Sequence, residues 1–373
     1  MPKLVFPNEP IFFTFSHLDR LLVFCHDNGA SDITIQSGER VLIEVNGVLE
    51  PITSRALSQQ EVSDLINHIY GPNATASLFS GKDLDTNYRV RVSDEKAYRY
   101  RVNITACLFD GYEGIQVTLR TLSSAPPPLD KMALPEILLD AMKLPQGILV
   151  ISGSTGSGKS TLLSSMIGEL VQKEGGKGMK ILTYESPVEY VYDEIPKPNS
   201  VVSQTEIPRF LPSFAAGVRN ALRRKPSLIL VGEARDQETI EAVIDAALTG
   251  HPVYTTVHSN GVADTLRRMV TAFEHAERDA RMYDLLESVK VIIWQALVRT
   301  PDGQRTPLRE YLIINDHVRD HLLKCPVEEL VTGIRELLPK YGKRIEDDAT
   351  EKYEAGLICE EAYKRFTEMK GVH

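Results

Sequence analysis

Cysteines and long apolar runs are both scarce in this sequence, and each shortage excludes a class of protein. The 373 residues include four cysteines, Cys25, Cys107, Cys325 and Cys359, and none of them belongs to a C-x-x-C pair. Neither a disulfide framework nor a zinc site is expected, and the spacing is typical of reduced thiols in a cytoplasmic protein. No apolar stretch approaches the roughly 18 residues that a membrane-spanning helix needs. Any association with a membrane is therefore expected to be peripheral and through partners.

The sequence also lacks an excess of positive charge. Lys and Arg number 42 against 51 Asp and Glu, which gives a net charge of -9 with neutral histidines. This balance argues against a chain that wraps nucleic acid over its whole surface, although it leaves room for a local basic groove. Trp294 is the single tryptophan, and the sequence offers no aromatic and basic platform for single strands. We therefore expect no obligatory nucleic-acid partner.

The first third of the chain predicts antiparallel strands. The segments "DITIQ" and "VLIEVNGVLEPI" alternate apolar and polar residues, and Asn46-Gly47 is a strong two-residue hairpin signal. A helical segment is expected over residues 61–70. Further strands are expected in "YRYRVNITACLFDG" and "GIQVTLRTL". Together these elements predict a small α+β domain over residues 1–122.

The segment "SSAPPPLDK" marks the clearest domain boundary. Three consecutive prolines among small residues form a stiff linker, which we place at residues 123–132. An ordinary surface loop is the alternative, but the periodicity changes here. Beyond it, "GILVIS", "KILTYE", "SLILVGE" and "PVYTTVH" alternate with helix-length segments, as in βαβ units with a mostly parallel sheet. We expect this α/β domain over residues 133–315 and a charged helical segment without strands over residues 316–373.

The segment "GSTGSGKST" fits the phosphate-loop pattern GxxxxGK[ST] and lies between a strand and an amphipathic helix. Backbone N–H groups of such a loop surround a phosphate, and the helix N-terminus adds partial positive charge. Lys159 would reach the β- and γ-phosphates of ATP, and the Ser160 hydroxyl would bind Mg²⁺. A chance glycine-rich turn is the alternative, and the strand–loop–helix setting argues against it. The nucleotide-binding candidates are Gly153, Ser154, Thr155, Gly156, Ser157, Gly158, Lys159, Ser160 and Thr161.

Three later strands of the expected parallel sheet end in ionisable residues. Glu185 and Glu189 follow "ILTY", Glu233 follows "LILVG", and His258 follows "VYTTV". Because ligands bind beyond the carboxyl ends of such strands, these side chains should converge on the phosphate loop. A carboxylate there can orient water, and a histidine can hydrogen-bond the γ-phosphate. Each residue has a structural alternative, and for Glu189 a cap or an ion pair is as well supported as catalysis. Their joint occurrence at one sheet edge favours a catalytic set.

Hydrolysis of ATP also needs positive charge near the γ-phosphate. Arg101 and Arg120 lie on expected strands of the first domain, and Arg219 precedes the "LILVGE" strand. A solvent-exposed surface charge is the alternative for each of them. For Arg235, which follows Glu233 in "LILVGEARD", a structural ion pair is favoured. The three arginines Arg101, Arg120 and Arg219 are therefore candidate phosphate contacts.

Taken in order, the motifs resemble those of the secretion ATPases of type II and type IV systems, a family that includes PilT-like pilus motors. The phosphate loop is followed by an Asp box, "ILTYESPVEYVY", an atypical Walker B segment, "LILVGEARD", and a His box, "TGHPVYTTVHSNGVADTLRRM". The segment "ASDITIQSGERVLIEVNGVLEPI" resembles the opening hairpin of the family's PAS-like domain. The resemblance extends over about residues 30–309. Within the family, the whole chain is most similar to the ATPases of type IVB secretion systems.

The resemblance implies a PAS-like α+β domain followed by a RecA-like P-loop domain. It implies that Glu233 is the catalytic carboxylate and that His258 senses the γ-phosphate. Glu185 and Glu189 would help to organise water and metal. Two positions depart from the family's pattern, since Ser186 stands where an aspartate is usual and Thr34 where pilus motors carry a histidine. The acidic role of the Asp box would therefore rest on its glutamates.

The resemblance also implies a homo-hexameric ring in which motion of the first domain against the second converts hydrolysis into force. Arg101 and Arg120 match positions where the first domain closes over nucleotide, and the proline linker would be the hinge. The tetracysteine motif of the zinc-bearing assembly ATPases is missing from the sequence. The helical segment over residues 316–373 does not match the retraction motors well. It would either dock to a specific system or complete the core of the second domain.

The motifs predict an ATPase that uses ATP and Mg²⁺, and the resemblance implies that it powers substrate export by a bacterial type IVB secretion system. Its expected partners are inner-membrane secretion-complex proteins, and its expected location is the cytoplasm, recruited to the cytoplasmic face of the inner membrane. A pilus-retraction or conjugation motor of the same family is the alternative. A DNA-translocating RecA-like motor and a regulator that binds nucleotide without hydrolysing it are two further alternatives. The acidic net charge disfavours the first of these, and the four converging ionisable groups disfavour the second.

Overall fold

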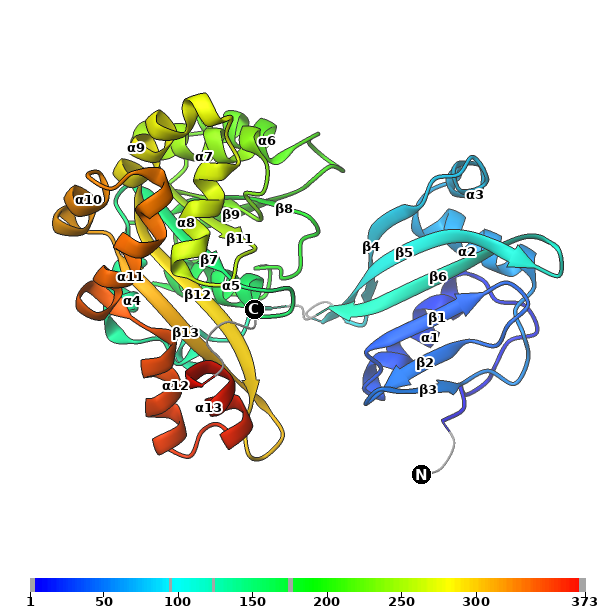
Figure 1. The fold of residues 1–373 in the computed structure, drawn as a ribbon. Coiled ribbons are helices and arrows are strands. Elements are labelled where there is room, and N and C mark those ends of the chain that lie inside the picture. The colour runs from blue at the N-terminus through cyan, green and yellow to red at the C-terminus, as the bar shows by residue number, and fades with distance from the viewer. Residues whose placement is uncertain (1–3, 94–95, 123–124, 174–176, 369–373) are drawn as a thin grey trace. The chain divides into compact units, whose positions relative to one another are not determined.

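The computed structural model describes residues 4–93, 96–122, 125–173 and 177–368. The chain divides into two compact units, Met1–Ala125 and Pro126–His373, each with its own sheet and its own core (Figure 1). Within these described ranges, the longest helices are too short or too polar to cross a membrane.

Residues of the expected linker lie partly in the second unit. Ser123 and Ser124, where we place its start, lie outside the described residues. Its last part forms a short 3-10 helix, η1 (Leu129–Met132), and Leu129 is buried in the core of the second unit. Ala133 follows with a φ of 47° and a ψ of 50°, a left-handed conformation that alanine seldom adopts. The linker thus ends in a fixed and strained turn.

The first unit is a six-stranded antiparallel sheet with three helices (Figure 1). Its strands run in the order β3-β2-β1-β6-β5-β4, and every pair of neighbours is antiparallel. This is the α+β domain that the alternating segments predict. The strands are β1 (Asp32–Gln36), β2 (Leu42–Val45), β3 (Val48–Pro51), β4 (Leu84–Arg91), β5 (Ala97–Phe109) and β6 (Tyr112–Leu122), and the helices are α1 (Phe15–Asp27), α2 (Gln59–Ile69) and α3 (Ala74–Phe79).

The helices of the first unit are set by apolar spacing and by one cap. Helix α1, for which we made no prediction, buries Leu18, Leu21, Leu22 and Cys25, a set with the helical spacing of three and four residues. Helix α2 confirms the predicted helix and begins with a capping box between Ser58 and Glu61. The buried faces of both helices join the sheet in one apolar core.

The second unit is built on an eight-stranded sheet in the order β14-β13-β12-β7-β11-β10-β8-β9. The six strands from β12 to β9 are parallel to their neighbours, whereas β13 and β14 pair antiparallel at one edge. The predicted mostly parallel α/β sheet is therefore confirmed. The strands are β7 (Gly147–Ser152), β8 (Lys180–Glu185), β9 (Val201–Glu206), β10 (Leu228–Val231), β11 (Pro252–Val257), β12 (Val289–Arg299), β13 (Arg305–Ile313) and β14 (Gly342–Lys343).

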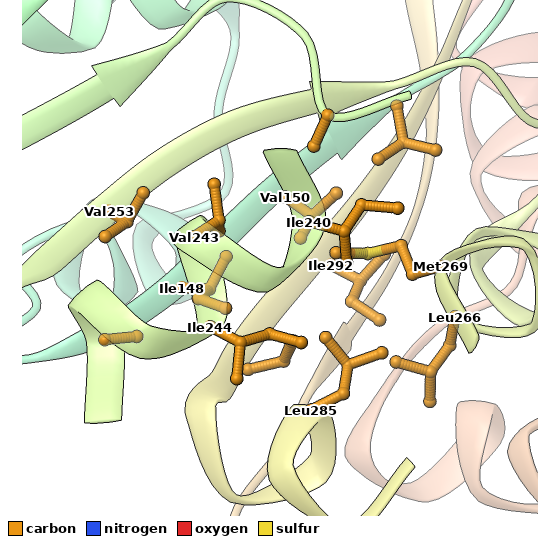
Figure 2. Packing of buried hydrophobic residues seen from close by; sticks show 14 of the residues in the cluster. Ile148, Val150, Ile240, Val243, Ile244, Val253, Leu266, Met269, Leu285 and Ile292 are labelled. Atoms are coloured by element: carbon orange, nitrogen blue, oxygen red, sulfur yellow. The ribbon is translucent and has the colours of Figure 1, made fainter. Parts of the chain in front are cut away.

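Helices cover both faces of this sheet, so its central strands are buried on both sides. All six residues of β7 are buried, as are all six of β11. Alternate residues of β7 enter two different cores, because successive side chains on a strand point to opposite faces. Figure 2 shows one of these cores, in which Ile148 and Val150 pack with Val243 and Leu266. The helices are α4 (Glu136–Ala141), α5 (Lys159–Gln172), α6 (Phe214–Ala221), α7 (Gln237–Leu248), α8 (Val262–Thr271), α9 (Arg278–Ser288), α10 (Asp316–Leu322), α11 (Leu330–Tyr341), α12 (Ile345–Glu354) and α13 (Glu360–Thr367), with short 3-10 turns η2 (His275–Glu277) and η3 (Val327–Glu329).

The C-terminal helices pack on the second unit. Val318 of α10 and Ile334 of α11 lie in the same core as the central strands. Helices α12 and α13 cover the outer part of β12 and β13, where Ala349 packs in a cluster with Val298 and Leu308. Our expectation of no strand after residue 315 is wrong in one respect, since β14 pairs with β13. The two residues of β14 are too few to produce a recognisable alternation.

Candidate functional site

The phosphate loop connects β7 to α5 at the carboxyl end of the central strand. Gly153, Gly156 and Gly158 have φ values of 145°, 75° and 82°, a region that favours glycine. A Cβ atom at Gly153 would lie 2.3 Å from the backbone oxygen of Gln295, and one at Gly158 would lie 3.1 Å from Gln295 Nε2. Glycine is therefore required at Gly153 by a close approach of the loop to β12 as well as by the loop's conformation.

The loop fits an anion. Helix α5 begins after Gly158, which has no side chain to cap it, so the N–H groups of the first turn remain available to a ligand. Lys159 Nζ donates to the carbonyl oxygens of Gly153 and Ser154 at 2.9 and 2.8 Å. Ser157 Oγ is buried and has no hydrogen-bond partner in the described part of the chain. The N–H groups of the first turn and the Ser157 hydroxyl therefore match the acceptor oxygens of a phosphate.

Burial affects the lysine of the loop. The Lys159 side chain is only 8% exposed, and burial lowers its pKa while the charges of Glu233 and Glu189 oppose this effect. A bound polyphosphate would add further negative charge around the ammonium group. The loop therefore holds a partly desolvated cation that is suited to a phosphate partner.

A cavity of about 200 Å³ opens in front of the phosphate loop. It brings together residues that are up to 103 positions apart, and all four predicted catalytic residues line it, as do Lys159 and Ser160. Strands β8, β10 and β11 contribute their carboxyl ends, as the strand-end argument predicts. The lining residues are Thr155, Gly156, Lys159, Ser160, Leu163, Ser164, Glu185, Ser186, Pro187, Glu189, Phe214, Leu230, Gly232, Glu233, Thr256 and His258.

Glu233 and His258 form a pair on one side of this cavity. His258 Nε2 lies 3.9 Å from Glu233 Oε1, and both side chains are partly exposed. Burial is the main cause of a lowered pKa for His258, and the nearby Lys159 lowers it further. The Glu233 carboxylate and a backbone hydrogen bond with Gly153 act in the opposite direction. The imidazole is consequently neutral at neutral pH and can both donate and accept hydrogen bonds.

Gly232 explains why the acidic residue follows the strand by two positions. The Gly232 N–H donates to the carbonyl of Tyr184 at 2.8 Å, and its own carbonyl accepts from Thr256 Oγ1 at 2.6 Å. A Cβ atom on Gly232 would lie 3.1 Å from the Tyr184 oxygen, which is closer than ordinary contact. Gly232 is thus held between β8 and β11 for one residue after β10 ends. Glu233 is the next residue, and its side chain lines the cavity.

Of the other two glutamates, Glu185 is the last residue of β8, and Glu189 lies in the segment that follows it. Glu185 is buried, and its Oε1 accepts from Thr183 Oγ1 at 2.6 Å and from Gln204 Nε2 at 3.2 Å. Its position is therefore fixed by the sheet. Glu189 is half-buried and lines the same cavity. Its neighbour Tyr190 shares a hydroxyl–hydroxyl bond of 3.0 Å with Thr161, which ties this segment to α5.

Two of the candidate arginines, Arg101 and Arg120, belong to the first unit, and the third, Arg219, belongs to the second. Arg101 of β5 and Arg120 of β6 are exposed and are paired in register on neighbouring strands of the first unit. Both line a shallow hollow that Asp32 also lines. Arg120 Nε lies 2.9 Å from Asp32 Oδ1. Arg219 of α6 is exposed, pairs with Glu238 at 3.0 Å and is not among the described residues that line the 200 Å³ cavity.

Arg235 and the acidic residues of the site were both considered for ionic contacts, the first for an ion pair and the second for a metal. Arg235 makes no ion pair within the described part of this chain, so the structural ion pair that we favoured for it is not found there. Its side chain is exposed and lies beside a small second cavity, which Arg268 of α8 also lines. The described residues include no cluster of three or more His, Cys, Asp or Glu that could hold a metal alone. Such a cluster is not required for Mg²⁺, which commonly binds through substrate phosphates and few protein ligands.

Sequence reasoning missed the polar residues that support the loop from behind. Gln295 and Arg309 lie on β12 and β13, and Gln295 Nε2 donates to the carbonyl of Ser157 at 2.7 Å. Thr265 Oγ1 lies 2.7 Å from both Ser152 Oγ and Ser259 Oγ, which links the base of the loop to the segment after His258. One signal was available in the sequence, namely a lone amide inside the apolar run "VIIWQALV".

Comparisons with known proteins agree with this geometry. Residues 14–331 match the family described as "Type II/IV secretion system protein". The Legionella pneumophila ATPase DotB, known from its X-ray structure, is 53% identical, with 97% of this chain and 98% of DotB covered and a TM-score of 0.90. The crystal structure of the pilus retraction motor PilT with bound ADP is 28% identical, with 95% and 97% covered and a TM-score of 0.82. The type IV pilus retraction ATPase PilT of Pseudomonas aeruginosa is 30% identical over 318 residues, which cover 85% of this chain and 88% of PilT. The chain therefore belongs to the type II/IV secretion system protein family, as a DotB-like and PilT-like ATPase.

Proposed function

We propose that the chain hydrolyses ATP with Mg²⁺ in the cavity before the phosphate loop, and that a homo-hexamer uses this energy to power substrate export by a type IVB secretion system. The observation that carries the proposal is the convergence of Lys159, Glu233 and His258 on one cavity. Similarity to DotB over nearly the whole chain supports the branch of the family. The ADP in the PilT structure supports a nucleotide as the ligand.

The roles proposed for the loop follow from its donors. The N–H groups at the start of α5 and the Lys159 ammonium group hold the phosphates, with Ser157 Oγ as a further donor. The Ser160 hydroxyl, which lines the cavity, would hold Mg²⁺, and the ion would supply positive charge to the phosphates. Of the chain's own groups, these are the ones that bind and orient the nucleotide. Thr161 secures the loop through Tyr190.

The roles proposed for the acidic residues and His258 follow from their surroundings. Glu233 holds and orients the attacking water, because its carboxylate lines the same cavity as the phosphate loop. His258 hydrogen-bonds the γ-phosphate as a neutral ring and is released when that phosphate leaves. Glu185, which is fixed by Thr183 and Gln204, and Glu189 organise water and metal in the cavity. Arg101, Arg120 and Arg219 are proposed to supply positive charge to the phosphates during turnover.

A pilus-retraction motor is the second candidate function. The observation in its favour is the 30% identity to the Pseudomonas aeruginosa PilT over 318 residues. Both functions share the ATPase site, so kinetic data on the isolated chain do not separate them. What separates them is the partner, which we propose to be an inner-membrane secretion-complex protein on the cytoplasmic face.

The test is capture of partners in an ATP-trapped state. A tagged Glu233→Gln chain is expressed in its own host, cross-linked and captured with ATP and Mg²⁺ present, beside a Lys159→Ala chain that should not hold nucleotide. We expect secretion-complex proteins to be enriched with Glu233→Gln and not with Lys159→Ala. Enrichment of pilus proteins would support the retraction motor instead. Stimulation of the purified ATPase by single-stranded DNA and not by secretion components would support a DNA motor.

A further inference from the structure

A buried pair of polar side chains supports the phosphate loop from the sheet. Gln295 of β12 lies opposite Arg309 of β13 in the antiparallel ladder, and both residues are 3% exposed. Gln295 Nε2 donates to the carbonyl of Ser157 at 2.7 Å, and Gln295 Oε1 accepts from Arg309 Nε at 2.8 Å. Both ends of the Gln295 amide are thus in use, so its orientation is determined by its two partners.

The other side of Arg309 faces the end of the linker. Its Nη1 donates to the carbonyl of Ala133 at 2.8 Å, and its Nη2 donates to the carbonyl of Met132 at 2.6 Å. Ala133 is the residue with the left-handed backbone, with a φ of 47°. Such a conformation is strained for alanine and persists where the surroundings hold it. The guanidinium group therefore fixes the last turn of the linker.

The charge of Arg309 makes this arrangement sensitive to displacement. The guanidinium donates to three neutral oxygens. The nearby carboxylate of Asp348, which accepts from the Arg309 backbone N–H at 2.9 Å, favours the charged form of Arg309 and so opposes the effect of burial. Burial lowers the pKa of Arg309 to about 10, so the group stays charged at neutral pH. A buried charge is tolerated when its hydrogen bonds are satisfied and becomes costly when one is lost. If one of the three acceptors moves, the buried guanidinium group must follow it or lose a hydrogen bond. If it follows, its hydrogen bonds to the other two acceptors are disturbed.

A change in the conformation of the phosphate loop would reach this network through the Ser157 carbonyl, which accepts from Gln295 Nε2. Gly156 and Gly158 flank Ser157 and both have positive φ, so the Ser157 peptide lies between two residues with wide conformational freedom. The loop is also in close contact with the backbone of β12, because a Cβ atom at Gly153 would come within 2.3 Å of the Gln295 backbone oxygen. A ligand that rearranges the loop will therefore alter the Ser157 carbonyl and its bond to Gln295.

We propose that Gln295 and Arg309 are positioning residues that couple occupancy of the phosphate loop to the end of the linker at Met132 and Ala133. The proposal rests on the proposed function in one respect, namely that nucleotide binds at the loop. It goes beyond that function because it assigns a route by which the nucleotide state reaches the segment that joins the two units. If Gln295 and Arg309 only supported the fold, binding of a nucleotide at the loop would not change the end of the linker.

Hydrogen exchange of the segment 129–134, measured with and without Mg²⁺ and ATPγS, tests the coupling. The variants are Gln295→Met, which keeps the side-chain volume and removes the amide, and Arg309→Lys, which keeps the charge and removes the fork. The matched controls are Gln304→Met and Arg305→Lys, since both residues are exposed and lie in or next to the same hairpin. Binding of a fluorescent ATP analogue and thermal unfolding are recorded for every chain.

In the unaltered chain and both controls, we expect the analogue to change exchange in residues 129–134 by roughly tenfold, which corresponds to about 1.4 kcal/mol. In Gln295→Met, we expect analogue binding to remain while this response is lost. Arg309→Lys should also bind the analogue and lose the response. In addition, residues 129–134 of this variant should exchange faster than those of the unaltered chain when no nucleotide is present. Ala133→Gly, which relieves the strained turn, should reduce the response with little effect on thermal unfolding.

Two results would overturn the coupling. One is a linker response of normal size in a folded Gln295→Met chain that binds nucleotide. The other is a linker that does not respond in the unaltered chain although the analogue binds. Failure of the unaltered chain to bind the analogue would be a different result, because it would refute the proposed nucleotide site and the coupling with it. If Arg309→Lys does not fold, Gln295→Met and Ala133→Gly still decide the question.

Discussion

His258 Nε2 lies 3.9 Å from Glu233 Oε1, at the carboxyl ends of the neighbouring parallel strands β11 and β10. The two side chains lie close together because of strand register. Val231 of β10 is paired with Thr255 of β11, and Glu233 and His258 follow shortly after these two strands end. A carboxylate and a neutral imidazole are thereby held at one cavity, facing the phosphate loop. This pair provides one group that can orient water and one that can respond to the γ-phosphate.

Replacement of Glu233 by glutamine should stop turnover and preserve binding. Glutamine keeps the size of the side chain and can still hydrogen-bond, but it does not accept a proton from water. We expect phosphate release to fall about 10²- to 10⁴-fold, the usual contribution of a positioned general base. Affinity for an ATP analogue should change little, because the phosphate donors of the loop are intact.

The matched control for Glu233 is Glu274→Gln, an exposed glutamate outside the cavity. It should retain normal turnover in the same phosphate-release assay. Normal turnover in Glu233→Gln itself would remove Glu233 from the catalytic role. A parallel loss of binding would instead point to a contribution of Glu233 to the fold of the loop.

The pH dependence of turnover should report on His258. Its pKa in the folded chain is lower than the ordinary 6.5, mainly because of burial, so the ring stays neutral until the pH is below 6.5. Turnover should therefore be maintained near pH 7 and fall as the pH decreases through the lowered pKa. The stability that the neutral ring contributes follows the same direction, being present above 6.5 and lost as the pH falls through the folded value.

The His258→Gln variant provides the comparison for this pH profile. It should lose about tenfold in turnover at neutral pH, equivalent to about 1.4 kcal/mol, and its profile should be flatter below pH 6.5. Steady-state rates at several pH values, with nucleotide binding measured in parallel, provide the data. If the variant has the same acid limb as the unaltered chain, another group is responsible for it.

The strands of the second unit that the sequence predicts correctly share one property. Strands β7, β8, β10 and β11 are short aliphatic runs separated by longer segments that contain helices, and this pattern is visible without any knowledge of contacts. The segment between β8 and β10 also contains β9, which we did not predict. We did not predict β12, whose residues "VKVIIWQALVR" form an apolar run that fits either a strand or a buried helix. Periodicity alone does not separate the two cases.

The site divides in the same way between predictable and hidden parts. Glu233 and His258 could be found because each follows an aliphatic strand whose carboxyl end lies at the ligand edge. The bond between Gln295 and Ser157 joins residues 138 positions apart, and that between Arg309 and Met132 joins residues 177 positions apart. Such pairings depend on sheet order and strand register, which one sequence does not encode in any local pattern.

The acid stability of the first unit should depend on Glu61. This carboxylate is 2% exposed and accepts from the Phe13 N–H at 2.7 Å, the Ser58 N–H at 2.8 Å and Arg55 Nη1 at 3.0 Å. Burial by itself raises the pKa of Glu61, but these hydrogen bonds outweigh it and lower the pKa to about 2 from an ordinary 4.5. Glu61 thus joins the start of α2 to the chain before α1 and is charged in the folded state.

Because the folded pKa of Glu61 is below the unfolded one, its contribution is present above pH 4.5 and is lost as the pH falls toward 2. We expect Glu61→Gln to lower the free energy of unfolding of the first unit by about 2–3 kcal/mol at neutral pH, the value of hydrogen bonds to a charged group. The difference from the unaltered chain should shrink as the pH is lowered through this window. Hydrogen exchange of residues 58–69 measures the first unit separately, and Glu39→Gln, at an exposed position, is the control. Equal protection of this segment in Glu61→Gln and the unaltered chain at neutral pH would show that the carboxylate does not stabilise the unit.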